Sequence, residues 1–151
     1  MSTKLTSVEA SPPALGLLMQ SGTRWIYQSV LNILHSRGYD ALTLSHLSFL
    51  ASLDCGQTQA SKVAERLGIS RQAVYRTMTD LQKQGFLILE TNPEQRNQKR
   101  ISMTNMGMEL AVDARKALGI AETEFANRVG LNSIEELRDR LDADLGLPLE
   151  K

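Results

Sequence analysis

One four-residue turn constrains the fold of this chain more than any other feature of its sequence. In LGIS at 67–70, a glycine that suits a helix end stands two residues before a serine that suits a helix start. Apolar residues recur at helical spacing on both sides of the turn. This pattern predicts one helix over 59–67, with Thr58 as its N-cap, and another over 71–84 that ends at Gly85.

Two strand-like stretches follow the second helix. Residues 86–91 are largely apolar, residues 98–104 alternate, and a polar turn at 92–97 joins them. This pattern predicts a β-hairpin. Two short helices followed by a hairpin form a winged helix-turn-helix, in which the second helix is the recognition helix and the hairpin is the wing.

Further helices are predicted on both sides of this unit. Apolar residues recur at helical spacing from 14 to 36, but Gly16 and Gly22 weaken the first half. We therefore expect the well-formed part of this helix to start near Ser21. The remaining helices are expected over 43–53, from about 107 to 128, and after Ser133, which suits an N-cap.

The predicted fold class is mainly α with a small β-hairpin wing. The N- and C-terminal helices would flank the winged helix-turn-helix and carry dimerisation, because their apolar faces exceed what a monomer of 151 residues can cover. The predicted division is a flexible tail at 1–12, an N-terminal dimerisation helix at 13–41, the winged helix-turn-helix at 42–104 and C-terminal dimerisation helices at 105–151.

The charges of the chain are unevenly distributed, although its 17 basic and 17 acidic residues cancel overall. Residues 57–104 carry eight Lys and Arg against four Asp and Glu, whereas residues 105–151 carry six against ten. A basic segment between neutral and acidic flanks indicates that the middle of the chain is the part that meets a polyanion.

The predicted helix over 71–84 has two chemically different faces. Val74, Met78 and Leu81 share its apolar side. The opposite side lacks the alternating Glu and Lys residues of an ordinary solvated helix. It comprises Gln72, Tyr75, Arg76, Thr79 and Lys83. Such side chains can reach a base edge or a phosphate, although the wheel alone fits an ordinary surface helix equally well.

Three stretches together resemble the multiple-antibiotic-resistance regulator (MarR) family of winged-helix transcription factors. They are TQASKVAERLGISRQAVYRTMTDLQKQGFLI at 58–88, NPEQRNQKR at 92–100 and ISMTNMG at 101–107. The resemblance spans roughly residues 42–116. It implies a homodimeric regulator that binds double-stranded DNA at a palindromic operator, most often as a repressor that a small ligand releases.

The resemblance also implies how the chain would contact DNA. Gln72, Tyr75 and Arg76 would read bases in the major groove, and Arg96 at the wing tip would enter the minor groove, where negative potential is concentrated. Ser70 would cap the recognition helix and could also donate to a phosphate. The remaining DNA-binding candidates are Arg71, Thr79, Lys83 and Lys99.

Members of this family often bind aromatic or phenolic anions between the dimerisation helices and the winged helix. The residues of this chain that could border such a cavity are Met19, Trp25, Tyr27, His46, Phe49 and Met106. A plain apolar core would account for most of them as well, and His46 would also suit a helix surface.

Other classes of function find little support in the sequence. Cys55 cannot form a disulfide within the chain, and the preceding Asp54 favours an inert thiol over a redox sensor. No metal-ligand spacing, catalytic triad or phosphate-binding glycine loop is present, so we expect no metal, no cofactor and no enzymatic activity. With no signal peptide and no long apolar run, the chain is expected to be cytoplasmic. A winged helix that binds protein instead of DNA is the alternative.

Overall fold

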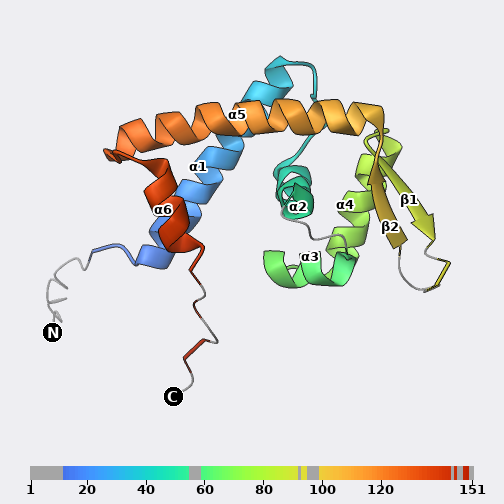
Figure 1. Cartoon of the computed structure of the whole chain (residues 1–151), viewed down its shortest axis with the longest axis horizontal. Coiled ribbons are helices and arrows are strands. Elements are labelled where there is room, and N and C mark those ends of the chain that lie inside the picture. The colour runs from blue at the N-terminus through green and yellow to red at the C-terminus, as the bar shows by residue number, and fades with distance from the viewer. Residues whose placement is uncertain are drawn as a thin grey trace, which may run out of the picture.

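The computed structural model describes residues 12–54, 59–91, 93–94, 99–143, 145 and 148–149. Figure 1 shows α5 running across the molecule and crossed by α1, while α2, α3, α4 and the hairpin gather beside the N-terminal half of α5 and α6 lies near its other end. The elements are α1 (Leu15–Ser36), α2 (Leu44–Asp54), α3 (Ala60–Leu67), α4 (Arg71–Lys83), β1 (Leu87–Thr91), β2 (Lys99–Met103), α5 (Asn105–Val129) and α6 (Ile134–Leu141).

The predicted fold class is confirmed. Strands β1 and β2 pair in antiparallel fashion, with Leu87 opposite Met103 and Leu89 opposite Ile101. Helices α3 and α4 pack against each other, and α4 leads directly into β1, so the three-part arrangement is a winged helix-turn-helix. Within the described ranges, no helix is long and apolar enough to cross a membrane.

Helix α1 is longer than expected. It begins at Leu15 and not near Ser21, so neither glycine in its first half breaks it. Gly22 lies against the ring of Phe125 on α5, where a Cβ atom would come within 3.4 Å of the ring. Packing of α1 along α5 therefore outweighs the intrinsic cost of glycine in a helix, which is about 1 kcal/mol.

The two helix ends that meet at the turn between α3 and α4 follow the prediction. Gly68 ends α3 in the left-handed conformation with φ 64°, and Ser70 caps α4 by accepting from the Ala73 amide at 3.1 Å. The start of α3 differs, because Gln59 occupies its N-cap position and makes no capping hydrogen bond. Thr58, the predicted cap, lies outside the described residues.

Thr104 joins the end of the recognition helix to the start of α5. Its hydroxyl donates to the Gly85 carbonyl at 2.6 Å and accepts from the Gly107 amide at 3.0 Å, which caps α5. Its amide donates to the Phe86 carbonyl at 3.1 Å. The turn after α4 and the first turn of α5 are thus held as one unit.

A single apolar core connects all parts of the winged helix to α1 and α5. Five large side chains drawn from four different helices are 0% exposed and so define its centre. They are Leu34, Val63, Val74, Leu81 and Leu110. Since this core includes residues of α4 and α5 alike, a shift of α5 would be transmitted to the recognition helix by packing.

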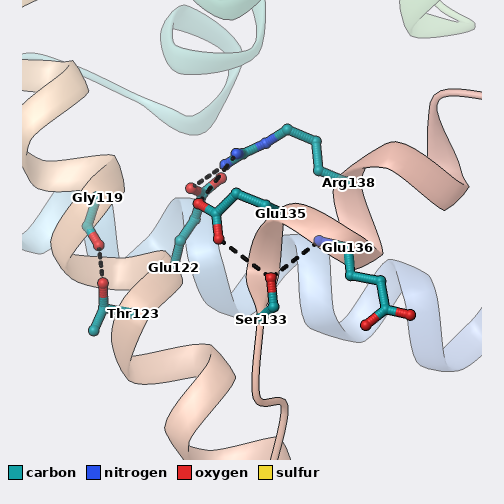
Figure 2. Close-up of polar contacts among 7 residues, drawn as sticks. All are labelled: Gly119, Glu122, Thr123, Ser133, Glu135, Glu136 and Arg138. Carbon is teal, nitrogen blue, oxygen red and sulfur yellow. Dashed lines mark hydrogen bonds and ion pairs between the residues drawn. The ribbon is translucent and has the colours of Figure 1, made fainter.

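Helix α6 is attached to α5 mainly by polar contacts. Figure 2 shows Arg138 of α6 contacting Glu122 of α5, with their closest atoms 2.7 Å apart. Ser133 caps α6 as predicted, accepting from the Glu136 amide at 3.2 Å. No residue of α6 is buried within the single chain, where Ile134 and Leu137 are half-buried and Leu141 is 56% exposed.

A polar cluster joins the end of α1 to the middle of α5. The Tyr39 hydroxyl donates to one carboxylate oxygen of Asp113 at 2.8 Å, and Arg37 contacts the other at 3.2 Å. Burial, and next the hydrogen bond to Asp113, raise the pKa of Tyr39 above its ordinary value of 10.0. The neutral phenol is therefore favoured in the folded protein.

We expect Tyr39→Phe to lower the free energy of unfolding by about 1–2 kcal/mol at neutral pH, because a hydrogen bond to a charged acceptor is lost. The raised pKa stabilises the parent fully below pH 10 and progressively less as pH rises through the folded value. Urea unfolding of both proteins at neutral pH and above pH 10 measures this. The difference in free energy of unfolding between parent and variant should narrow at the higher pH. A difference that stays constant would contradict the role given to the Tyr39 hydroxyl.

Candidate nucleic-acid interface

The recognition helix α4 is anchored by one face and presents the other to solvent. Val74, Met78 and Leu81 are at most 1% exposed and fix α4 in the core. The opposite face is exposed over its whole length, as the wheel predicts. This face, which we call the outer face of α4, comprises Gln72, Tyr75, Arg76, Thr79 and Lys83.

Tyr75 is the large aromatic residue of the outer face, and 38% of its surface is exposed. It stands between Gln72 and Arg76, which offer an amide and a guanidinium on the same side. Amide and guanidinium groups form paired hydrogen bonds with adenine and guanine edges respectively. The outer face therefore has the chemistry of base readout at its N-terminal half.

The first turn of α4 provides further donors. The Ser70 hydroxyl oxygen accepts from the Ala73 amide, which leaves its proton able to donate outward. Arg71, the first residue of α4, is exposed beside it. A helix N-terminus with a hydroxyl and a guanidinium is suited to a phosphate oxygen.

Helix α3 adds cations that the sequence analysis did not single out. Lys62 and Arg66 are both exposed on α3, which precedes the recognition helix. The excess of positive charge over residues 57–104 was the signal that could have identified them. Such cations strengthen binding to any phosphate backbone without reading its sequence.

Two wing residues and the cysteine are placed only in part or not at all. Lys99 begins β2, where it pairs with Thr91 of β1. Arg96 at the expected wing tip, and Cys55 between α2 and α3, lie outside the described residues.

His46 does not lie on a helix surface, and it is not among the residues that line the cavity between α1, α2, β2 and α5. It is 2% exposed, and its ring lies between the start of α2 and the recognition helix. Its Nδ1 atom accepts from the Thr43 amide at 3.0 Å, and its Nε2 atom lies 3.3 Å from Asp80 Oδ2 on α4. Both ring nitrogens are therefore engaged in contacts within the protein.

A cavity of about 390 Å³ lies between α1, α2, β2 and α5. Its wall is largely apolar, with Leu47, Leu50, Met103 and Met108 among its residues, and it includes the guanidinium-bearing Arg115. This volume is in the range of small-molecule sites, and a mostly apolar wall with few polar groups is typical of them.

The six predicted ligand residues do not come together around this cavity. Tyr27 lines it, whereas Phe49 is 1% exposed in the core and Met19 and Met106 are exposed to solvent. Trp25 packs against Phe125, with ring centroids 6.1 Å apart, and lies under Arg128 at 5.2 Å. His46 makes the contacts given above. Among the described residues, no group of three or more His, Cys, Asp and Glu side chains could hold a metal ion.

Large apolar side chains are exposed at the end of the molecule away from the hairpin. Each is between 47% and 72% exposed, and they come from the first half of α1, the second half of α5 and α6. They are Leu15, Leu17, Leu18, Met19, Ile120, Val129 and Leu141. We call this set the terminal apolar surface. Several large exposed apolar side chains at one end of a molecule are typical of a protein interface.

Comparisons with known proteins agree with this geometry. A family described as "HTH domain" matches residues 53–94, which include α3, α4 and β1. A comparison with curated protein sequences gives no match. The solved structures with a similar fold include MarR from E. coli in its apo form, with 16% identity over 87% of this chain and 96% of that chain and a TM-score of 0.68.

Two further structures come from Rhodococcus. A MarR-family transcriptional regulator from Rhodococcus sp. RHA1 is 23% identical, covering 86% of this chain and 94% of that chain with a TM-score of 0.68. CouR from Rhodococcus jostii RHA1, solved bound to p-coumaroyl-CoA, is 22% identical, covering 88% and 92% with a TM-score of 0.67. The chain thus carries an HTH domain within the winged helix-turn-helix fold of the MarR-family regulators.

Proposed function

We propose that this protein is a homodimeric, sequence-specific DNA-binding transcription regulator, acting as a repressor that a small ligand releases. The observation that carries the proposal is the outer face of α4, which is polar, basic and exposed while the opposite face is anchored in the core. The HTH match over 53–94 and the fold shared with MarR-family regulators support it. A protein-binding face would need a larger apolar patch at this position.

In this proposal each side chain has a defined role. Gln72, Tyr75 and Arg76 read bases in the major groove. The phosphate contacts come from Ser70, Arg71, Thr79, Lys83 and Lys99, while Arg96 enters the minor groove. Each protomer contributes one recognition helix, so the operator is palindromic, with half-sites about one helical turn apart.

Selection of bound duplexes from a random DNA library tests the function directly. We expect enrichment of one palindromic sequence, because two identical recognition helices related by a two-fold axis read the same half-site twice. Binding of protein partners without enrichment of any sequence would favour the alternative of a protein-interaction module and overturn the proposal.

The cavity between α1, α2, β2 and α5 is the proposed site of the releasing ligand. A mostly apolar wall that includes Arg115 and Tyr27 suits a small aromatic anion. The ligand in the CouR structure, p-coumaroyl-CoA, carries an aromatic acyl group and supports this chemical class. Titrating aromatic carboxylic acids into the complex with the selected duplex measures release.

The terminal apolar surface is the proposed dimer interface, formed by residues 13–41 and 105–151. We expect light scattering to give twice the chain mass of 16.7 kDa at micromolar concentration. Replacing Leu15 and Leu18 by lysine should shift the protein to monomer, because the dimer would bury unpaired charges. Ile88→Lys is the matched control, since Ile88 is 45% exposed on the wing. A parent protein that is monomeric and folded would contradict the interface.

A further inference from the structure

A buried histidine links the helix beside the cavity to the recognition helix. His46 lies in the first turn of α2, is 2% exposed, and has its Nε2 atom 3.3 Å from Asp80 Oδ2 of α4. The next residue of α2, Leu47, lines the cavity, as does Leu50 one turn later. The contact therefore connects a wall of the cavity with the helix that carries the outer face.

Hydrogen bonding fixes which nitrogen of His46 carries the proton. The Thr43 amide donates to Nδ1 at 3.0 Å, so Nδ1 must offer its lone pair and bear no proton. In the neutral ring the proton is then on Nε2, which is the atom beside the Asp80 carboxylate. The His46 amide in turn contacts the Thr43 hydroxyl at 3.4 Å, so the first turn of α2 holds the ring in place.

Asp80 is the only acidic residue in the sequence of α4. A carboxylate on a helix that approaches phosphates weakens DNA binding by simple repulsion. Asp80 stands between Thr79 of the outer face and the buried Leu81 in the sequence. Its contact with His46 places its side chain on the side of α4 that faces α2. Its side chain is 58% exposed, so the contact adds little to the free energy of unfolding.

We propose that His46, acting through Asp80, is a positioning residue that holds the recognition helix at the angle required for operator discrimination. The inference rests on the proposed DNA-binding function and adds a residue that does not itself touch DNA. Asp80 then has two separate effects on DNA binding, repulsion of the phosphates and orientation of α4. Repulsion acts on every duplex alike, whereas orientation acts on the difference between operator and random sequence.

A double-mutant cycle with the full chain tests the proposal. The probes are the duplex selected by the parent protein and a random duplex of equal length, titrated at fixed salt against parent, His46→Asn, Asp80→Ala and the double variant. An asparagine oxygen at position 46 can still accept from the Thr43 amide, and Asp80 is exposed, so we expect both variants to retain the fold, which a thermal melt of each variant checks. Glu65→Ala is the matched control, since it removes an exposed carboxylate from α3.

We expect each single variant to lower the ratio of operator to random affinity about tenfold, and the double variant to lower it no further, because both remove one contact. Glu65→Ala should tighten both duplexes slightly and leave the ratio unchanged. Rescue by Asp80→Asn, which retains an acceptor oxygen beside Nε2, would support orientation over charge. A ratio unchanged in both single variants overturns the inference alone. A selection that enriches no sequence overturns the proposed function and the inference together.

Discussion

Gly107→Ala is expected to destabilise the protein by about 3 kcal/mol, at the upper end of the usual cost of overpacking. A Cβ atom built at Gly107 would overlap the backbone carbonyl oxygen of Phe86 and come within 3.1 Å of its carbonyl carbon. A flexible side chain could move aside, but this obstacle is backbone, and the Phe86 carbonyl already accepts the Thr104 amide.

The clash would open the junction between α4 and α5. To admit the methyl group, α5 must move away from the turn that follows α4, which loosens the contacts of Thr104 with Gly85 and Gly107. Because the recognition helix ends at this turn, we also expect weaker discrimination of the operator by whatever fraction remains folded. Chemical denaturation followed by circular dichroism measures the stability change.

Gly119→Ala is the matched control for this prediction. Gly119 lies in the same helix, and a Cβ atom there would meet nothing within 4 Å. Figure 2 shows its carbonyl accepting from Thr123, a contact that a methyl group leaves intact. Alanine is the better helix former, so Gly119→Ala should stabilise by about 0.5–1 kcal/mol. Equal changes in the free energy of unfolding for the two substitutions would show that the close approach of Gly107 to Phe86 does not limit the packing of α5.

The position of Gly107 illustrates what the sequence can and cannot predict. Glycine and serine at 67–70 determine helix ends through local backbone preferences, so the helix-turn-helix was predicted correctly from pattern alone. The obstacle at Gly107 comes from Phe86, which is distant along the chain. Such a contact leaves no periodic signal in the sequence. Gly22 is a second example, since it lies against the ring of Phe125, which is also distant along the chain.

The recognition helix and the ligand residues show the same division between local and distant information. A single helical wheel was enough to separate Val74 from Arg76, because both positions depend only on helix periodicity. Apolar character could not separate Tyr27, which lines the cavity, from Phe49, which fills the core. The sequence left a cavity wall and a helix surface open for His46, and its buried position between α2 and α4 depends on a partner from another helix, Asp80.

Arg76→Ala is expected to cause the largest loss of function among single changes on the outer face of α4. If its guanidinium pairs with a guanine edge, the loss is about 1–3 kcal/mol for each half-site. A dimer loses this contact in both half-sites of the operator. Binding to random DNA, where no guanine edge is in register with Arg76, loses only the electrostatic attraction of one cation per protomer to the phosphates. The substitution should therefore relax base preference at one position of each half-site. Arg76 is exposed, so the melting temperature should change little.

Lys83→Ala is the comparison that separates base readout from phosphate binding. Lys83 lies at the C-terminal end of the same face, is also exposed and carries the same charge. We expect it to weaken operator and random duplexes by similar factors and to reduce the salt dependence of binding by about one unit of slope for each protomer. Titrations of both variants across a salt series, with both duplexes, distinguish the two roles. An Arg76→Ala protein that still prefers its operator as strongly as the parent would exclude Arg76 from base readout and assign discrimination to Gln72 and Tyr75.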